Sequence, residues 1–87
     1  PTRSPPQVAI THLLSPLPGL FYHRASPDSP PFKLPGDQIA VGEVIGLIEV
    51  MKSFNEVRAD AAGRLVRYLV SHEGEVMPGE PFAELDA

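Results

Sequence analysis

The sequence predicts an all-β domain of two four-stranded antiparallel sheets. Short segments rich in Val, Ile and Phe recur at intervals of about 8–12 residues and are separated by Gly and Pro, which is typical of a barrel or sandwich. The chain also repeats itself, because residues 38–49 (QIAVGEVIGLIE) align with residues 75–86 (EVMPGEPFAELD), and residues 15–21 (SPLPGLF) align more weakly with residues 59–65 (ADAAGRL). Two copies of one four-strand unit would form two sheets related by a pseudo-twofold axis.

Proline dominates the beginning of the chain, with nine of the eleven prolines in the first 35 residues. Residues 1–7 (PTRSPPQ) are typical of the end of a stiff linker, and we expect one domain over residues 8–87. Segments 8–14 (VAITHLL) and 20–22 (LFY) predict strands. The prolines of 24–31 (RASPDSPP) predict a loop, because they are excluded from helix interiors and central strands.

The rest of the chain is divided by Gly and Pro into segments of strand length, and we expect strands at 44–50, 53–59, 64–70 and 81–87. A helix over 48–62 is the alternative, since Glu49, Met51 and Lys52 are good helix formers. The Val and Ile residues around them favour a strand. The repeat favours the strand further, because its two copies carry glycine turns and apolar positions in register.

Lys52 is one of only two lysines and lies between apolar segments in GLIEVMKSFNEV (46–57). The repeat places it just past the end of the first copy, where the second copy reaches the C-terminus. We therefore expect Lys52 at the tip of a β-hairpin, at the junction of the two halves. From the pattern alone, an ordinary solvated charge is the commonest role of such a lysine, and Met51 beside it is more typical of a core residue.

Several motifs carry a family resemblance. EVMKSFNEV (49–57) is similar to the attachment sequence Glu-Ala-Met-Lys-Met, SPLPGLFYH (15–23) to SPMxGxFY, VGEVIGLIEVMK (41–52) to VGDTLCIVEAMK, and EVRADAAGRL (56–65) to xIEADxSGxV. With these motifs, the chain over residues 12–87 resembles the biotinyl domains of biotin carboxyl carrier proteins of acetyl-CoA carboxylase. ASPDSPPF (25–32) resembles the thumb loop of those carriers.

The resemblance implies a flattened barrel with Lys52 at a hairpin tip and biotin joined to it by an amide bond. A lysine amine can be acylated, whereas an arginine guanidinium stays protonated. Met51 separates the motif from the Asp-Lys-Ala of lipoyl domains, and it is a candidate residue for recognition by the biotin ligase. Val50 replaces the usual Ala and Ser53 the usual Met or Leu, so we expect recognition by the biotin ligase to be weaker than typical.

The resemblance further implies a non-catalytic carrier in fatty acid biosynthesis. A biotin protein ligase would attach the biotin, a biotin carboxylase would carboxylate it with ATP and bicarbonate, and a carboxyltransferase would form malonyl-CoA. The alternatives are a carrier for another acyl substrate, a lipoyl carrier and a biotin-free interaction domain. The expected location is the cytoplasm, or the plastid stroma in a plant or alga, and a homo-oligomer of the full-length chain stays open.

Composition argues against several other classes. The chain has no cysteine, so it has no disulfide and no thiolate metal site, and no apolar run approaches the roughly 20 residues of a membrane span. Its net charge is −4, with ten acids against four basic residues over 37–87, so we expect no nucleic-acid surface. His12, His23 and His72 are too dispersed to predict a metal site. Because the chain begins with Pro1, we expect a fragment of a longer protein.

Overall fold

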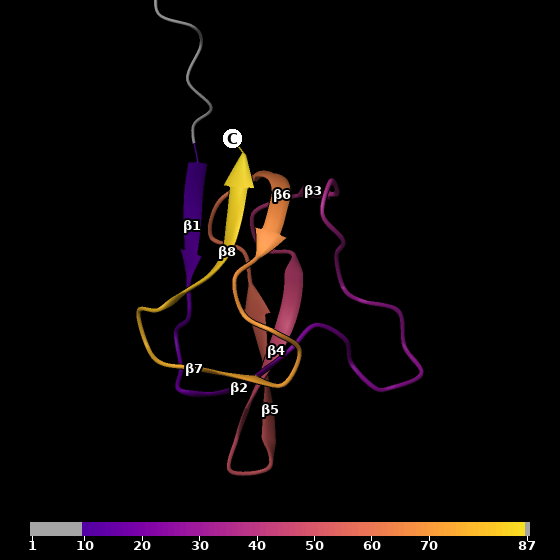
Figure 1. Ribbon diagram of the computed structural model, residues 1–87, viewed down its shortest axis with the longest axis vertical. Coiled ribbons are helices and arrows are strands. Elements are labelled where there is room, and N and C mark those ends of the chain that lie inside the picture. Colours follow the sequence, from indigo (N-terminus) through magenta and orange to yellow (C-terminus); the bar gives the residue numbers. More distant parts are fainter. Residues whose placement is uncertain (1–9, 87) are drawn as a thin grey trace, which may run out of the picture.

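The computed structural model describes residues 10–86 and shows an all-β architecture of eight strands in that range (Figure 1). The strands form two four-stranded sheets, sheet A in the order β1-β8-β6-β3 and sheet B in the order β5-β4-β2-β7, and every neighbouring pair is antiparallel. The predicted fold class is confirmed. The strands are β1 Ile10–Leu14, β2 Gly19–Tyr22, β3 Gln38–Ile39, β4 Val44–Val50, β5 Ser53–Arg58, β6 Gly63–Tyr68, β7 Gly74–Val76 and β8 Pro81–Asp86.

The topology confirms the internal repeat. If four is added to each strand number, with the count continuing from β8 to β1, the order of sheet A becomes the order of sheet B. Each sheet therefore contains two strands from each half of the chain, as a pseudo-twofold axis requires. In the first copy β3 leads into β4, and in the second copy β7 leads into β8.

The core consists of inward-facing residues from both sheets, as expected when successive side chains of a strand point to opposite faces. Positions aligned by the repeat are buried in pairs. Burying each of these aliphatic or aromatic side chains stabilises the fold by roughly 1.5–3 kcal/mol. The pairs are Ile39 with Val76, Ile45 with Phe82, Ile48 with Leu85, and Phe21 with Leu65.

Two aligned glycines begin β2 and β6 because neither position has room for a side chain. A Cβ atom on Gly19 would overlap the carbonyl of Glu49, and one on Gly63 would lie 2.9 Å from the carbonyl oxygen of Asp86. Glu49 and Asp86 are themselves aligned in the repeat. Both halves therefore use glycine for the same close approach between neighbouring strands.

The predicted strand boundaries agree with the structure to within two residues in the part of the chain that it describes. Residues 1–9 and 87 lie outside the described residues, so the predicted linker and the first two positions of the first predicted strand are outside them too. The alternative helix over 48–62 is wrong, because that segment forms most of the β4–β5 hairpin. No helix between residues 10 and 86 is long and apolar enough to cross a membrane.

Candidate functional site

The β4–β5 hairpin ends in a two-residue turn formed by Met51 and Lys52. Val50 pairs with Ser53 directly below the turn. Met51 and Lys52 have φ angles of 49° and 69°, and a two-residue turn with both φ angles positive is of type I′, whose twist matches that of the flanking strands. Asn and Gly usually occupy such turns, whereas a left-handed conformation costs other residues about 1–2 kcal/mol each. The hairpin tip is therefore placed by the strands below it and not by favourable turn residues.

Both side chains of the turn extend into solvent. Met51 is 94% exposed, so its interpretation as a core residue is wrong. Lys52 is exposed, and its ammonium makes no hydrogen bond or ion pair with any of the residues that the structure describes. Val50 is half-buried and packs against the core, whereas Ser53 is exposed. Of the four predicted site residues, Val50 is therefore anchored to the core, whereas Met51, Lys52 and Ser53 are exposed at the hairpin tip.

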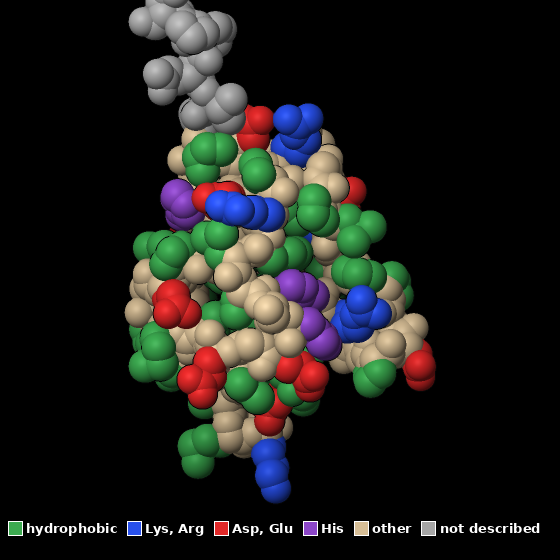
Figure 2. Space-filling view, in the orientation of Figure 1, with side chains coloured by type: hydrophobic (Ala, Val, Ile, Leu, Met, Phe, Trp, Pro, Cys, Tyr) green, Lys and Arg blue, Asp and Glu red, His purple; other side chains and the backbone are tan. Residues whose placement is uncertain are grey.

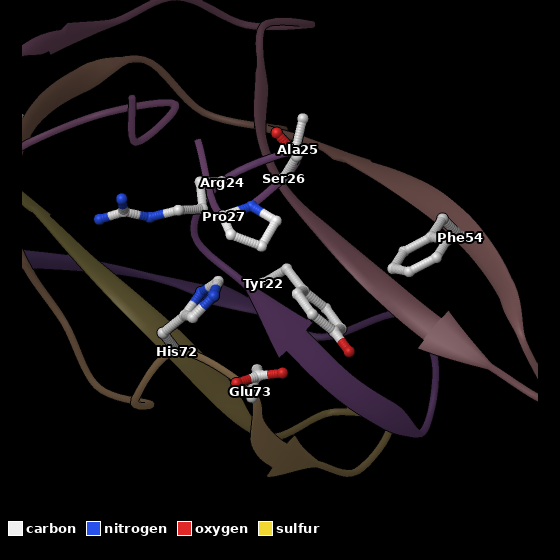
Figure 3. A pocket seen from close by; sticks show the side chains of 8 residues that line it. All are labelled: Tyr22, Arg24, Ala25, Ser26, Pro27, Phe54, His72 and Glu73. Carbon is white, nitrogen blue, oxygen red and sulfur yellow. The ribbon is translucent and has the colours of Figure 1, made fainter. Parts of the chain in front are cut away.

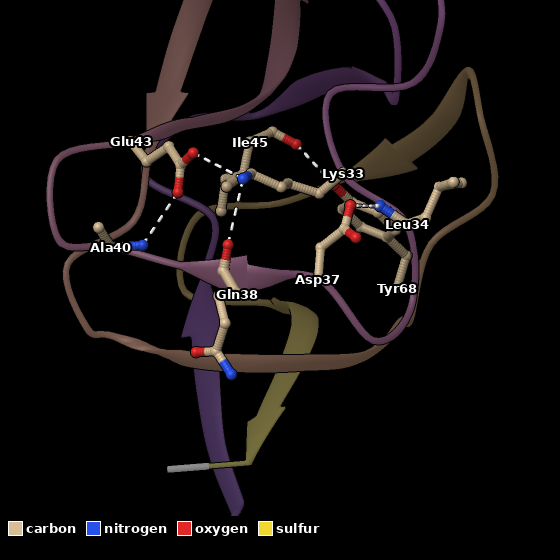
Figure 4. A network of polar contacts seen from close by, with 8 residues as sticks. All are labelled: Lys33, Leu34, Asp37, Gln38, Ala40, Glu43, Ile45 and Tyr68. Carbon is tan, nitrogen blue, oxygen red and sulfur yellow. Dashed lines mark hydrogen bonds and ion pairs between the residues drawn. The ribbon is translucent and has the colours of Figure 1, made fainter.

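The other lysine, Lys33, lies in the opposite kind of environment (Figure 4). Its Nζ is 2.6 Å from the Glu43 carboxylate and donates a hydrogen bond to the carbonyl oxygen of Gln38 at 3.1 Å. The hydrogen bond from Lys33, and a second from the Ala40 N–H, lower the pKa of Glu43. Lys33 is thus paired and largely covered, whereas the amine of Lys52 is exposed and makes no such contact with the described residues.

A pocket of about 470 Å³ lies between loop 24–31 and sheet B (Figure 3). Residues Arg24 to Pro27 line it on the loop side, and Tyr22 and Phe54 contribute an aromatic wall with ring centroids 5.3 Å apart. Phe54 follows Lys52 by only two residues, so the pocket lies beside the stem of the hairpin. Such a mixture of aromatic and polar lining is typical of a site for a small organic ligand.

Loop 24–31 is held in shape by hydrogen bonds of its own. A β-bridge between Arg24 and Pro31 closes its base. At its tip the Ser29 N–H donates to the Ser26 carbonyl oxygen at 3.0 Å, and the two hydroxyl groups are 2.8 Å apart. The predicted loop is therefore confirmed, and it presents a defined wall to the pocket.

Tyr22 fixes an acidic group near the tip of the hairpin. Its hydroxyl donates to the Glu49 carboxylate at 2.6 Å. This hydrogen bond, then burial and the charges of Glu49 and Glu73, raise the pKa of Tyr22 to about 12. The hydrogen bond from the phenol keeps the carboxylate three residues before Lys52 in one position on the sheet.

Two histidines that are distant in the sequence meet near the base of the loop. The backbone N–H of His23 donates to Nδ1 of His72 at 3.0 Å, and Nε2–H of His23 donates to the Val70 carbonyl oxygen at 2.8 Å. The His23 ring stacks on Tyr68 with centroids 4.2 Å apart, and burial lowers the pKa of His23. Sequence reasoning missed this anchor, because no local pattern links residues 49 positions apart. Among residues 10–86 no His, Cys, Asp or Glu group is arranged to hold a metal.

Comparisons with known proteins agree with this geometry. The biotin carboxyl carrier protein of acetyl-CoA carboxylase from Chlamydia muridarum is 42% identical over 67 residues, which are 77% of this chain and 41% of that protein. The Streptococcus pyogenes protein of the same name is 44% identical over 66 residues, 76% of this chain and 40% of the other. The chloroplastic protein from Glycine max is 34% identical over 73 residues, 84% and 28% of the two chains. The chain thus spans about two fifths or less of the length of these relatives.

A solved structure and a family model extend the comparison. The structure of a single-chain, multi-domain long-chain acyl-CoA carboxylase has the same fold, with a TM-score of 0.72 over 97% of this chain and 8% of that chain at 23% identity. A family model described as "Biotin-requiring enzyme" matches residues 11–85, which makes biotin the cofactor of this domain. The chain belongs to the family of biotin-requiring enzymes.

Proposed function

We propose that this chain is the biotin carrier domain of an acetyl-CoA carboxylase, with biotin joined through an amide bond to Nζ of Lys52. The observation that carries the proposal is the exposed, unpaired Lys52 in a tight turn, found in a chain of a biotin-requiring family. In this proposal the domain positions and moves its cofactor and performs no catalysis of its own.

The hairpin and the lysine have separate roles. Strands β4 and β5 hold the stem through an antiparallel ladder, while the flexible Lys52 side chain supplies reach. The exposed amine can enter the active site of a biotin protein ligase. Once attached, biotin supplies the ring that carries a carboxyl group from a biotin carboxylase to a carboxyltransferase, which forms malonyl-CoA for fatty acid biosynthesis. The tether keeps that ring at high effective concentration near both enzymes.

The pocket beside loop 24–31 is the resting place that we propose for the ring. Tyr22 and Phe54 offer aromatic faces, and the loop offers backbone groups and the Ser26 hydroxyl to the ureido group of biotin. A single net hydrogen bond is worth about 1 kcal/mol. Such a contact is weak enough to release the ring to an enzyme and strong enough to keep it out of water for most of the time.

The location and assembly that we propose follow the relatives. They are bacterial and chloroplastic carrier proteins, which supports a cytoplasmic location, or the plastid stroma if the source is a plant or alga. A homo-oligomer of the full-length chain stays open.

The test is labelling by a biotin ligase with biotin and ATP, read by intact mass and peptide mapping. One biotin should appear, on Lys52. Lys52→Arg should abolish labelling without lowering the melting temperature, because the exposed side chain contributes little packing. The matched control Lys33→Arg should be labelled like the unchanged chain. Biotin on Lys33, or lipoate in place of biotin on Lys52, would overturn the proposal.

A further inference from the structure

Loop 24–31 leaves sheet B at His23, directly after β2, and meets the turn between β6 and β7 there. The backbone N–H of His23 donates to Nδ1 of His72 at 3.0 Å, and the His23 carbonyl oxygen accepts a hydrogen bond from the Phe32 N–H at 2.8 Å. His23 therefore joins the two ends of the loop to each other and to the second half of the chain.

His72 lies in a turn that is fixed to the sheet. The Gly74 N–H donates to the Ser71 carbonyl oxygen at 2.8 Å and closes the turn. The Glu73 N–H donates to the Phe21 carbonyl oxygen at 2.6 Å. Glu73 has a φ angle of 65°, a left-handed conformation that persists only where neighbouring contacts impose it. The backbone of the turn therefore presents the His72 ring to the base of the loop from one defined position.

The two imidazole rings differ in how they are held. His23 is half-buried, stacks on Tyr68 and donates from Nε2 to the Val70 carbonyl oxygen. Burial lowers the pKa of His23, so its ring stays neutral to a lower pH than an ordinary histidine. His72 is exposed, lies edge-on to Tyr22 with ring centroids 5.4 Å apart, and makes no other hydrogen bond with a described residue. His72 is therefore the ring of the pair that solvent protons reach.

A proton on Nδ1 of His72 and the hydrogen bond from His23 exclude each other. A neutral imidazole has one nitrogen that accepts a hydrogen bond, whereas both nitrogens of an imidazolium are donors. The contact at Nδ1 places the proton of neutral His72 on Nε2. A second proton would go to Nδ1 and would point at the His23 N–H, so the two donors would separate. Because the closed form binds fewer protons than the open form, a fall in pH favours the open form.

Charges of both signs lie beside the His72 ring. Arg24 and Glu73 line the same pocket as His72 (Figure 3). Figure 2 shows two histidine side chains side by side at the surface, with a basic side chain on one side of them and acidic side chains below. The other titratable groups that face the pair are two phenols, which keep their charge between pH 5 and 8, and the carboxylate bound to one of them. These groups are Tyr22, Tyr68 and Glu49. Within this cluster the imidazole of His72 is therefore the group that takes up a proton in mild acid.

We infer that the hydrogen bond between His23 and His72 is a proton-sensitive latch, which closes the base of loop 24–31 at neutral pH and opens it in mild acid. His72 and residues Arg24 to Pro27 of the loop line the same pocket, so an open latch displaces one wall of that pocket. The consequence for biotin rests on the proposed function: the ring leaves its resting place as the pH falls, and a larger share of it becomes available to the partner enzymes.

The test follows the intact chain without biotin by NMR as the pH is lowered from about 8 to about 5, a range that spans the ordinary titration of histidine. Imidazole signals report the protonation of each histidine, and amide signals report the state of the latch. The His23 amide signal should shift with the same midpoint as the His72 imidazole signal. Over that range the protection of the Phe32 amide from hydrogen exchange, corrected for the intrinsic effect of pH, should fall about fivefold, the equivalent of one net hydrogen bond.

Three substitutions assign the change to the latch. His72→Asn keeps a side-chain oxygen that can accept the hydrogen bond and does not titrate, so the loop should stay closed at the acid end of the range. His72→Leu removes the acceptor and should lower the protection of the Phe32 amide about fivefold at the alkaline end as well. The matched control His12→Asn removes the histidine that pairs with Glu84 on sheet A and should leave the pH dependence unchanged. Circular dichroism and melting curves confirm that each variant is folded.

Two results would overturn the latch: an equal pH dependence in the unchanged chain and in His72→Asn, or a Phe32 amide whose protection does not change with pH. The biotinylated chain tests the consequence, because its ring signals should become more mobile over the same pH range and should stay constant in His72→Asn. Ring signals that do not respond when the latch opens would overturn the link between latch and ring. A chain that takes no biotin on Lys52 would overturn the proposed function, whereas the latch is measured without biotin.

Discussion

The type I′ turn at Met51 and Lys52 invites a substitution that separates stability from function. Replacing the two residues by Asn and Gly installs the sequence that such turns prefer. The left-handed conformation costs Met51 and Lys52 about 1–2 kcal/mol each. Asn at position 51 removes part of this cost and Gly at position 52 removes it. Gly in turn lowers stability by about 0.5–1 kcal/mol, because the unfolded chain is more flexible at a glycine. Met51 is 94% exposed and Lys52 is unpaired among the described residues, so the substitutions lose little contact. The net gain expected is about 1 kcal/mol in the free energy of unfolding.

Thermal unfolding followed by circular dichroism measures this gain. For a domain of this size 1 kcal/mol raises Tm by about 4–8 °C. Met51→Asn alone should supply part of the rise and keep Lys52, whereas the control Met51→Ala should leave Tm unchanged, because Ala has the same difficulty with a φ of 49°. An unchanged or lower Tm for the Asn-Gly variant would refute the strain that we assign to the turn.

Three further predictions concern the surroundings of the tip. Val50→Ala with Ser53→Met should speed biotinylation at equal ligase concentration, and equal or slower labelling would contradict the role that we assign to these two residues. Val50→Ala alone should lower the free energy of unfolding by about 1 kcal/mol, because Val50 packs against the core. Glu43→Gln should flatten the pH dependence of Tm. Lys33 lowers the pKa of Glu43 below its ordinary 4.5, so the pair stabilises the fold above that pH and the benefit is lost as the pH falls through the folded pKa; an equal slope in both proteins would argue against the pair. Shortening loop 24–31 to two glycines should leave the domain folded and biotinylated but make the ring more mobile by NMR and lower carboxyl transfer, and unchanged ring signals would reduce the loop to a connection.

The sequence was sufficient to predict the architecture because the same four-strand pattern occurs in both halves of the chain. Over 48–62 local propensity favoured strand over helix only modestly. The alignment with 75–86 strengthened the strand prediction, since Ile48 and Leu85 are aligned in it and both are buried. The turn could not be predicted from its own residues, because Met51 and Lys52 carry no Gly or Asn signal. It was placed by the ends of the strands on either side.

The contacts around the site could not be predicted in the same way. Tyr22 on β2 contacts Glu49 on the neighbouring strand β4, and His23 contacts His72 from the second half of the chain. These pairs depend on strand order and register, and periodicity within one segment carries no trace of them. The exposure of Met51 is a similar case, because an apolar side chain beside apolar strands resembles a core position until the turn directs it outwards.

The placement of Val50 explains how a small domain can deliver a tethered ring with accuracy. The core extends along β4 as far as this residue, two positions before Lys52. Backbone order therefore continues to the base of the arm, and the freely moving part begins at the Lys52 side chain itself. A looser hairpin would add the motion of the stem to that of the arm and spread the ring through a larger volume, which lowers its effective concentration at each enzyme. A tip in an unfavourable turn is compatible with this requirement because the buried stem below it holds the backbone in place.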